Sequence, residues 1–423
     1  MPDDDLDADA TATDAAPAVK PPVGPAPEFT WVQHADGLAA VVAALAAAPW
    51  VALDTESISM FVYRERMCLL QINAGGTMFV VDTLALGGHP GKAVELSPEG
   101  SAEGSGAAGA TVAEGPSQTL APLRAQLERS DRRLYLHGGE YDVGVFKRDY
   151  GIQLGGIWDS QQAAAFLGFE KTGYGAVVER FCGVALDKGW AQYDWGTRPL
   201  DPAALRYAID DVVYLPRIAE ELEKAITAAG LEEELALANQ AVSETTWSGG
   251  FDAGGFWRIK GVRELPQPAL AVLAVLHAWR DGIARDADKP PGRMINNETM
   301  LALARHAPTN FQLLKRIGAK GWLLHAHGED LIATIKKARS DPKPLPPRPR
   351  QREVLPIEEE REKRLKDWRR AEAERRGVPL QVVLPARALE HLKQHGAGDL
   401  NAVPQLGAKR ISLIGDHLRR LAE

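Results

Sequence analysis

Residues Trp50–Glu56, with the sequence WVALDTE, decide the fold: an apolar run follows Pro49 and ends in two acids. A short, partly β-branched apolar run predicts a buried strand. Asp54 and Glu56 are two residues apart, so on a strand both side chains point to the same side. Two carboxylates crowded at the edge of a core favour a cation between them, and hard oxygen ligands suit Mg²⁺ or Mn²⁺. An ordinary strand end is the alternative, because Asp-Thr-Glu also occurs by chance.

Length and cysteine content set the broad class of the protein. The chain has 423 residues, which predicts roughly three domains of about 150 residues each. Its two cysteines, Cys68 and Cys182, exclude a disulfide framework and a cysteine metal site, and fit a reducing cytoplasm. The acidic start does not resemble a signal peptide, and no apolar run approaches the roughly 18 residues of a membrane span. We therefore expect a soluble cytoplasmic protein that does not contact membranes.

Charge is divided unevenly along the chain. The net charge of -8 combines residues 1–257, with 17 Lys and Arg against 37 Asp and Glu, and residues 258–423, with 32 against 20. The first part is therefore at -20 and the second at +12. This division favours a polyanion as partner of the second part while the first part handles metal. Solvated Lys- and Arg-rich helices are the alternative.

The segments around Trp50–Glu56 predict an antiparallel meander. A helix is expected at Leu38–Ala48, before the first strand. Further strands are expected at Arg66–Asn73 and Thr77–Asp82, and Gly75-Gly76 between them is typical of a hairpin turn. Residues 87–118 are rich in Gly, Ser, Ala and Glu, which predicts a flexible insertion.

A further candidate acid, Asp142, follows a predicted strand at Leu134–Leu136. The sequence after this strand turns sharply at His137-Gly138-Gly139, and Asp142 falls in the first turn of the next helix. The helix dipole favours a carboxylate there, which is a purely structural explanation for Asp142. Asp159 precedes another helix and fits an N-cap, so we assign it that role and no chemistry.

A predicted helix over Pro202–Ile226 carries Tyr207 and Asp211, four residues apart. This spacing places the phenol and the carboxylate on one helix face. Asp210 points about 100° away from Asp211 and is expected to be solvated.

Taken together, these motifs resemble a known family. Asp54-Thr55-Glu56, the segment from His137 to Asp142, and Tyr207 with Asp211 are similar to the three motifs of the DEDDy 3′–5′ exonucleases. The stretches 186–188 (Leu-Asp-Lys), 194–195 (Asp-Trp) and 198–200 (Arg-Pro-Leu) resemble the region that marks ribonuclease D within that superfamily. The similarity covers roughly residues 29 to 235, interrupted by the Gly-rich insertion.

The resemblance implies a ribonuclease H-like α/β fold, with a mixed central sheet flanked by helices, and two divalent ions, Mg²⁺ or Mn²⁺. It implies that the metal ligands are Asp54, Glu56, Asp142 and Asp211, and that Tyr207 orients the attacking water. One departure is Tyr141, where the family usually has an acid. We keep Asp142 as the ligand because the residues around it fix the register of the motif, and Glu140 is the alternative.

The second part of the chain contains an internal repeat. Leu276–Arg280 (LHAWR) recurs as Leu365–Arg369 (LKDWR), and Ile317–Lys320 (IGAK) recurs as Leu406–Lys409 (LGAK), both at a spacing of 89. A period this long, present twice, predicts a duplicated domain. Each copy resembles the HRDC module, a small all-α helical bundle.

The expected organisation is a disordered acidic tail (1–27), an exonuclease domain (28–235), a connector (236–255), a first HRDC domain (256–340), a Pro-rich linker (341–352) and a second HRDC domain (353–423). Candidate substrate contacts are Lys188, Arg198, Lys320 and Lys409. Lys188 and Arg198 could equally pair with Asp187 or Asp194. Lys320 and Lys409 lie in Gly-Ala-Lys turns that could bind phosphate, although helix packing alone would also explain these turns.

We therefore expect a metal-dependent 3′–5′ exoribonuclease that releases nucleoside 5′-monophosphates from structured RNA such as tRNA precursors. In this hypothesis the two HRDC domains grip the body of the RNA, and the protein is a monomer. A DNA 3′–5′ exonuclease is one alternative, because only contacts to the 2′-hydroxyl discriminate between the sugars. A non-catalytic RNA-binding module on an inactive nuclease fold is the other.

Overall fold

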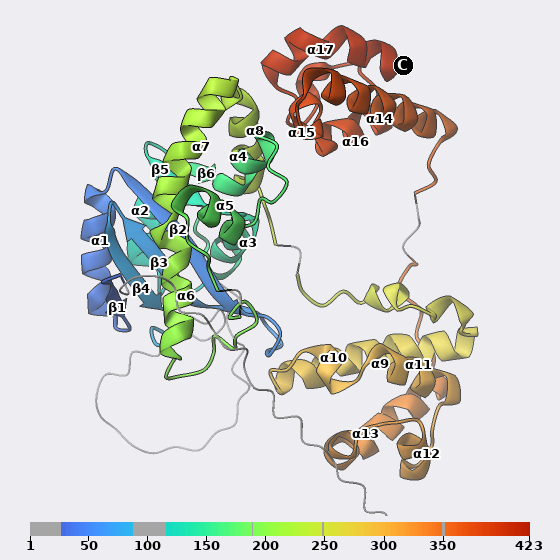
Figure 1. The fold of residues 1–423 in the computed structure, drawn as a ribbon. Helices are drawn as coiled ribbons and strands as arrows, with labels where there is room; N and C mark the ends of the chain where they lie inside the picture. Colours follow the sequence, from blue (N-terminus) through green and yellow to red (C-terminus); the bar gives the residue numbers. More distant parts are fainter. Residues whose placement is uncertain (1–26, 88–115, 188, 248, 349–351) are drawn as a thin grey trace, which may run out of the picture.

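The computed structural model describes residues 27–87, 116–187, 189–247, 249–348 and 352–423 (Figure 1). Nearly all of the predicted tail, most of the predicted Gly-rich insertion, Lys188 and part of the Pro-rich linker therefore lie outside the described residues. Within the described ranges, no helix is both long enough and apolar enough to cross a membrane.

A six-stranded sheet with the order β1-β4-β3-β2-β5-β6 forms the centre of the first domain. Its strands are β1 (Thr30–Val32), β2 (Trp50–Ile58), β3 (Arg66–Ala74), β4 (Thr77–Asp82), β5 (Arg133–Leu136) and β6 (Ile157–Asp159). The strands β2, β3 and β4 form the predicted antiparallel meander, whereas β1 is parallel to β4 and β5 is parallel to both β2 and β6. The predicted mixed sheet is confirmed.

The strand β2 alternates between two hydrophobic cores, as a period of two requires. Val51 and Leu53 pack into the core that contains α1 (Leu38–Ala47), and Ala52 packs into the core on the other face. Asp54 and Glu56 continue the alternation of Ala52. The register of β2 against β3 shifts directly after Glu56. An irregularity of this kind bends a strand and re-aims side chains next to it.

Helices cover both faces of the sheet, as Figure 1 shows. After a 3₁₀ turn (Ala35–Gly37) and α1, they are a 3₁₀ turn (Ala121–Leu123), α2 (Arg124–Leu127), α3 (Glu140–Val145) with a π-helical continuation (Phe146–Tyr150), α4 (Ser160–Phe166), α5 (Tyr174–Cys182), α6 (Pro202–Val213), α7 (Leu215–Ala229) and α8 (Glu232–Ser243). The core on the face of Ala52 is built from α4, α5, α7 and α8. The expected domain boundary at residue 235 falls inside α8, which packs against β6 and α4.

The single helix expected over Pro202–Ile226 is two helices in the structure. It breaks at Tyr214, between α6 and α7, and Pro216 occupies the first turn of α7. Proline has no amide hydrogen and its ring clashes with the preceding turn, so it starts a helix more readily than it continues one. The prediction of one continuous helix was wrong for this reason.

Two helical bundles follow the first domain. The first begins with 3₁₀ turns (Gly255–Arg258 and Val262–Glu264) and consists of α9 (Gln267–Asp286), α10 (Pro291–Met294), α11 (Asn297–His306), α12 (Phe311–Arg316) and α13 (Gly321–Ser340). The second consists of α14 (Pro356–Arg376), α15 (Leu380–Val383), α16 (Ala386–His395), a 3₁₀ turn (Leu400–Ala402) and α17 (Gly407–Leu421). The starts of α9, α10 and α11 precede those of α14, α15 and α16 by the same 89 residues as the sequence repeat.

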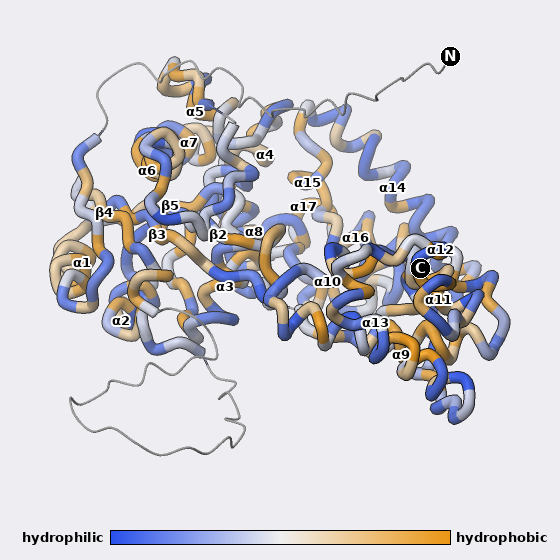
Figure 2. Tube along the Cα trace, turned by 90° about the horizontal axis from the view of Figure 1, so that it is seen from below, coloured by the Kyte–Doolittle hydropathy of each residue, from blue (hydrophilic) through white to orange (hydrophobic). Residues whose placement is uncertain are grey.

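The bundles differ in the polarity of their long first helices. Figure 2 shows α9 as largely hydrophobic and α14 as largely hydrophilic. Many apolar residues of α9 are buried against α11 and α13. In α14 the buried apolar residues are Leu365 and Ala373.

Each bundle contacts the first domain at a different place. The loop between β2 and β3 and the first residue of β3 meet the first bundle: the Tyr63 hydroxyl donates to Asp281 at 2.7 Å, and Arg66 pairs with Asp288. The helix α8 meets the second bundle, where Lys409 Nζ lies 3.0 Å from Glu234 Oε1. The loop that meets the first bundle directly follows the strand that carries Asp54 and Glu56.

Candidate metal centre

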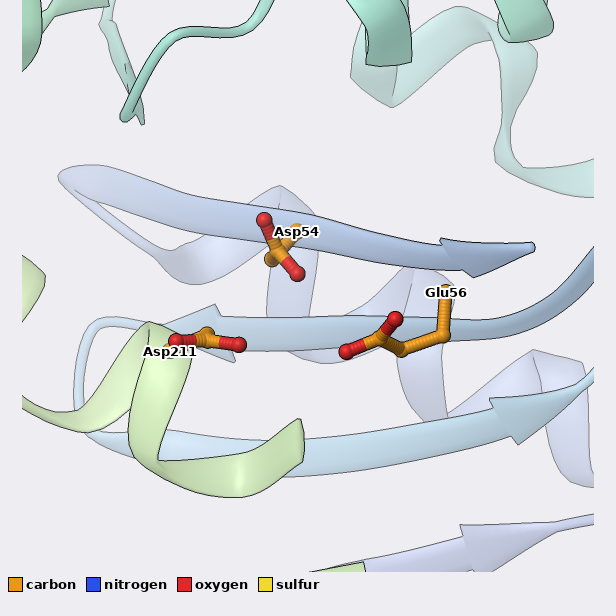
Figure 3. A group of neighbouring side chains, drawn as sticks. All are labelled: Asp54, Glu56 and Asp211. Atoms are coloured by element: carbon orange, nitrogen blue, oxygen red, sulfur yellow. The ribbon is translucent and has the colours of Figure 1, made fainter. Parts of the chain in front are cut away.

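Three carboxylates from two distant parts of the chain converge beside the sheet. One carboxylate oxygen each of Asp54, Glu56 and Asp211 lies within 4.8 Å of the others. Figure 3 shows Asp54 and Glu56 extending from β2 toward Asp211 on α6. The strand period places the first two on one face, and α6 packs against β2 and β3. These three predicted ligands are therefore brought together.

Asp142 lies next to this group, held by a hydrogen bond of its own. The Thr55 hydroxyl donates to Asp142 Oδ1 at 2.5 Å. The charge of Asp142 nevertheless contributes to the raised pKa values of Asp54, Glu56 and Asp211. The fourth predicted ligand is thus close to the other three, and Thr55 fixes its orientation.

The turn before α3 explains why Asp142 is placed there. Asp159 caps α4 by accepting from Gln161 N at 2.8 Å, as predicted, and its carboxylate also accepts from Gly139 N at 2.8 Å. Gly139 has no room for a side chain, because an added Cβ would lie 2.4 Å from a methyl carbon of Leu136. The acid assigned to capping alone therefore also fixes the loop that presents Asp142.

The acids of this group resist ionisation. Burial is the main cause, and the negative charges of the neighbouring acids add to it: together they raise the pKa values of Asp54 and Glu56 well above their usual range. Burial and the charges of Asp210 and Asp142 raise the pKa of Asp211 to about 8. Burial also raises the pKa of Asp142, to about 6.

The charged neighbours that shift the pKa values of Asp54, Glu56 and Asp211 are all acids. Crowded carboxylates of this kind need a compensating positive charge. An all-oxygen donor set suits a hard divalent cation. The arrangement therefore fits the metal that the resemblance implies.

Tyr207 lies one helical turn before Asp211, as its spacing predicts. Its ring stacks on Trp195, with centroids 6.2 Å apart and planes inclined by 29°. Trp195 is 2% exposed and belongs to the core. Burial, and then the charges of Asp211, Glu56 and Asp54, raise the pKa of the Tyr207 phenol. The phenol therefore keeps its proton at neutral pH.

Two nearby residues differ from their sequence-based expectations. Asp210 was expected to be solvated but is 4% exposed, and its carboxylate accepts from Arg206 Nε at 2.9 Å. Arg198 was expected to pair with Asp187 or Asp194 if it did not contact substrate. Its guanidinium instead donates to both oxygens of the buried Asp82, at 2.7 and 2.8 Å. The Arg198–Asp82 pair joins residues 116 apart in the chain and depends on tertiary packing, whereas Arg206 and Asp210 are four residues apart on α6.

The three candidate lysines for substrate binding differ in their environment. Lys188 lies outside the described residues. Lys320 is exposed at the N-cap position of α13, whereas Lys409 is engaged by the acids of α8.

Two residues of the centre were missed by the sequence analysis. Thr55 orients Asp142, and the only signal for it is its position between two ligand candidates. Tyr174 is close enough to Asp211 and Asp54 for their charges to raise its pKa, after burial as the main cause. Its hydroxyl donates to the Asp210 carbonyl at 2.9 Å. No motif in the sequence distinguishes this tyrosine.

Comparison with known proteins agrees with this geometry. A 3′–5′ exonuclease family matches residues 29–227, and the HRDC domain family matches residues 269–335. Ribonuclease D of Jannaschia sp. is 30% identical over 318 residues, which cover 73% of each chain. Ribonuclease D of Escherichia coli K12 is 28% identical over 324 residues, which cover 74% of this chain and 76% of the relative.

Solved structures give the same fold. The crystal structure of Escherichia coli RNase D, described as an exoribonuclease involved in structured RNA processing, has a TM-score of 0.65 at 25% identity and covers 93% of this chain and 98% of its own. A protein from Bifidobacterium adolescentis has a TM-score of 0.71 at 18% identity, covers 93% and 96%, and supports the fold alone. With an exonuclease domain, an HRDC domain and a relative at 30% identity over most of its length, this chain belongs to the ribonuclease D family of 3′–5′ exoribonucleases.

Proposed function

We propose that this chain shortens RNA from the 3′ end by hydrolysis at the centre formed by Asp54, Glu56, Asp142 and Asp211, and that it releases nucleoside 5′-monophosphates. The observation that carries the proposal is the convergence of three carboxylates within 4.8 Å. The charged neighbours that shift the pKa values of these three carboxylates are all acids, so none of them supplies a positive charge to balance the group. A site of this kind is costly for folding unless a cation occupies it.

The four acids would hold two divalent ions, Mg²⁺ or Mn²⁺, which supply positive charge for the entering and leaving oxygens of the phosphodiester. Asp54 and Glu56 are fixed by the central strand β2, Asp211 by α6, and Asp142 by its hydrogen bond to Thr55. Ligands on rigid elements keep their positions when substrate binds. Hydrogen bonds to ligand carboxylates typically affect metal affinity by 10- to 100-fold.

Tyr207 is the residue that we propose to orient the attacking water. Its raised pKa keeps the hydroxyl protonated, so it can donate one hydrogen bond while its lone pairs accept another. The stack on the buried Trp195 fixes the ring beside Asp211. Tyr207 therefore acts by positioning and need not remove a proton itself.

The natural substrate that we propose is structured RNA with a free 3′ end, such as a tRNA precursor. The Escherichia coli relative is described as acting in structured RNA processing. The surplus of +12 over residues 258–423 supports a grip on RNA by the helical bundles. Among the candidate substrate contacts, the exposed Lys320 keeps this role in our proposal. Arg198 and Lys409 are engaged by Asp82 and Glu234.

We propose that the second bundle is a second HRDC domain, because its helices repeat those of the first at a spacing of 89. The domain limits are also proposals. We extend the first domain from the expected limit at residue 235 through α8 to Ser243, and keep the HRDC domains at 256–340 and 353–423 and the linker at 341–352. Both cysteines are free, and the burial of Cys68 supports the expected cytoplasmic location. A monomer stays our proposal for the oligomeric state.

A direct test compares RNA and DNA of one sequence, labelled at the 5′ end, with the wild type and Asp54→Asn in Mn²⁺. We expect stepwise shortening of RNA and a rate that is lower by more than about 100-fold in Asp54→Asn. Asp201→Asn is a matched control, because Asp201 caps α6 and Asn is an equally good cap. Preference for DNA would assign a DNA exonuclease instead. Absence of Mn²⁺-dependent hydrolysis on either substrate would leave a binding module.

A further inference from the structure

The first helical bundle exposes a patch of aromatic and basic side chains where α12 meets α13. Three large apolar residues that a bundle would ordinarily bury are open to solvent: Phe311 is 43% exposed, Leu313 38% and Trp322 46%. Lys315 and Arg316 end α12, and the exposed Lys320 precedes α13. We call the set Phe311, Leu313, Lys315, Arg316, Lys320 and Trp322 the turn surface.

The charge of this segment has one sign. Residues 311–328 contain three Lys and Arg and no Asp or Glu. Surface lysines and arginines are normally interspersed with acids, so a segment of one sign next to exposed rings indicates an anionic partner that also presents flat apolar faces. Unpaired nucleic acid has both properties, because its backbone is charged and each base has a π-face.

The second bundle provides an internal comparison at the same spacing of 89. The positions equivalent to Phe311 and Trp322 are Leu400, which is 3% exposed, and the partly buried Ile411. The positions equivalent to Lys315 and Arg316 are occupied by proline and glutamine. The aromatic and basic character of the turn surface is therefore not required to build a bundle of this kind.

The equivalent turn of the second bundle is used to dock on the first domain. Lys409 Nζ lies 3.0 Å from Glu234 Oε1, and its backbone amide donates to Glu233 Oε1 at 3.1 Å. Gly407 is so close to α8 that an added Cβ would lie 2.5 Å from Glu233 Oε1. Two acids of α8 thus hold this turn, whereas Lys320, the equivalent of Lys409, is exposed.

We propose that the turn surface binds an unpaired segment of the RNA substrate, with Trp322 and Phe311 stacking on bases and the three cations contacting phosphates. This inference rests on the proposed function and names the part of the RNA that the first bundle holds. An unpaired segment is favoured over a duplex because stacking requires splayed bases, whereas an A-form helix keeps its bases covered.

The first bundle contacts the loop that follows β2, the strand that carries Asp54 and Glu56. The helix α9 packs against α13 and also carries Asp281, which accepts from the Tyr63 hydroxyl at 2.7 Å. Tyr63 belongs to the loop that follows β2 and therefore Glu56. RNA bound at the turn surface is therefore held by the same bundle that contacts the loop after β2, the strand that carries Asp54 and Glu56.

The test is RNA binding by the full-length chain in EDTA, so that hydrolysis does not contribute. Fluorescence anisotropy measures the Kd for a labelled unstructured RNA of about 20 nucleotides across a range of salt concentrations. Trp322→Ala should weaken binding by about fivefold or more, which is the lower end of the effect of one stacked base. The triple variant Lys315→Gln, Arg316→Gln, Lys320→Gln should reduce the slope of log K against log salt by about 2, since each lost phosphate contact on a single strand contributes about 0.7.

A matched control removes two exposed cations from the other end of α13, with Lys336→Gln and Lys337→Gln. The proposal is overturned if Trp322→Ala binds the unstructured RNA like the wild type, or if the control changes the slope as much as the triple variant. It is also overturned if the turn-surface variants weaken binding only to a blunt RNA duplex. Unchanged calorimetric transitions of each variant show that the bundle still folds. Mn²⁺-dependent hydrolysis of a tetranucleotide by the wild type tests the proposed function separately, because that reaction does not depend on a binding site in the bundle.

Discussion

Replacing Asp211 by asparagine should stabilise the metal-free protein, although Asp211 is proposed to be essential for activity. Burial, with the charges of Asp210 and Asp142, raises the pKa of Asp211 from 3.8 to about 8. Below pH 3.8 the carboxyl carries its proton in both the folded and the unfolded chain. As the pH rises above 3.8, the unfolded chain ionises while the folded chain keeps the proton, so the free energy of unfolding falls by about 1.4 kcal/mol per pH unit. The loss is complete near pH 8.

Asparagine has nearly the same shape and no titratable proton, so Asp211→Asn does not undergo this loss. Between pH 5 and pH 8 the advantage of the variant should grow by about 4 kcal/mol. For a domain of this size that is a difference of about 10 °C in the unfolding midpoint. Differential scanning calorimetry of the full-length chain in EDTA measures it, on the transition that moves when Mn²⁺ is added to the wild type.

Adding Mn²⁺ should change the order of stability. The wild type gains about 2.7 kcal/mol at a free concentration of 100 times the Kd, and Asp211→Asn gains much less because it lacks one ligand. Asp201→Asn removes the same charge from the other end of α6 and should not change either result. The reasoning is refuted if Asp211→Asn lowers the midpoint in EDTA at pH 8, or if the difference between the proteins does not increase with pH.

Three further predictions concern other parts of the structure. Tyr207→Phe should lower the single-turnover rate by about 100-fold with little change in the Kd for RNA, because only the hydroxyl that orients the water is lost; an unchanged rate would remove Tyr207 from the mechanism. Asp82→Asn leaves the Arg198 guanidinium without its charged partner and should lower the free energy of unfolding by about 2–3 kcal/mol, measured with urea in EDTA. Lys409→Ala removes an ion pair between the second bundle and α8, so the bundle should undock and the radius of gyration in small-angle X-ray scattering should increase. Lys320→Ala, at the equivalent position of the first bundle, should leave the radius unchanged. Equal behaviour of the two variants would argue against docking through this turn.

The parts of the fold that were predictable from the sequence are those set by local periodicity. The run at Trp50–Leu53 predicts a strand because β-branched and apolar residues cluster there, and the period of two then places Asp54 and Glu56 on one face. The spacing of Tyr207 and Asp211 places both on one helix face in the same way. The position of Asp211 relative to Asp54 depends on how α6 packs against the sheet, and it was predicted only through the resemblance to a family.

The parts that were not predictable depend on which surfaces meet. Asp210 was assigned to solvent from its angle on the helix, but it is buried: α6 packs on β2 and β3, and the hydroxyl of Tyr174, from α5, donates to the Asp210 carbonyl. Arg206, one turn earlier, pairs with the Asp210 carboxylate. Arg198 finds Asp82, which is 116 residues away in the chain. A charged residue pairs with whichever opposite charge the fold brings near, and a motif does not contain that information.

The duplicated bundles show how one sequence element acquires two roles. The repeat at a spacing of 89 predicts two similar turns, each with Gly-Ala-Lys, and the helices recur at that spacing. The sequence of the second turn does not reveal its docking, because the acids that hold Lys409 belong to α8, more than 170 residues earlier. In our proposal one copy of the turn docks on the first domain, and the other contacts RNA. The aromatic and basic residues around Lys320, which have no counterparts around Lys409, are what this division of roles would produce.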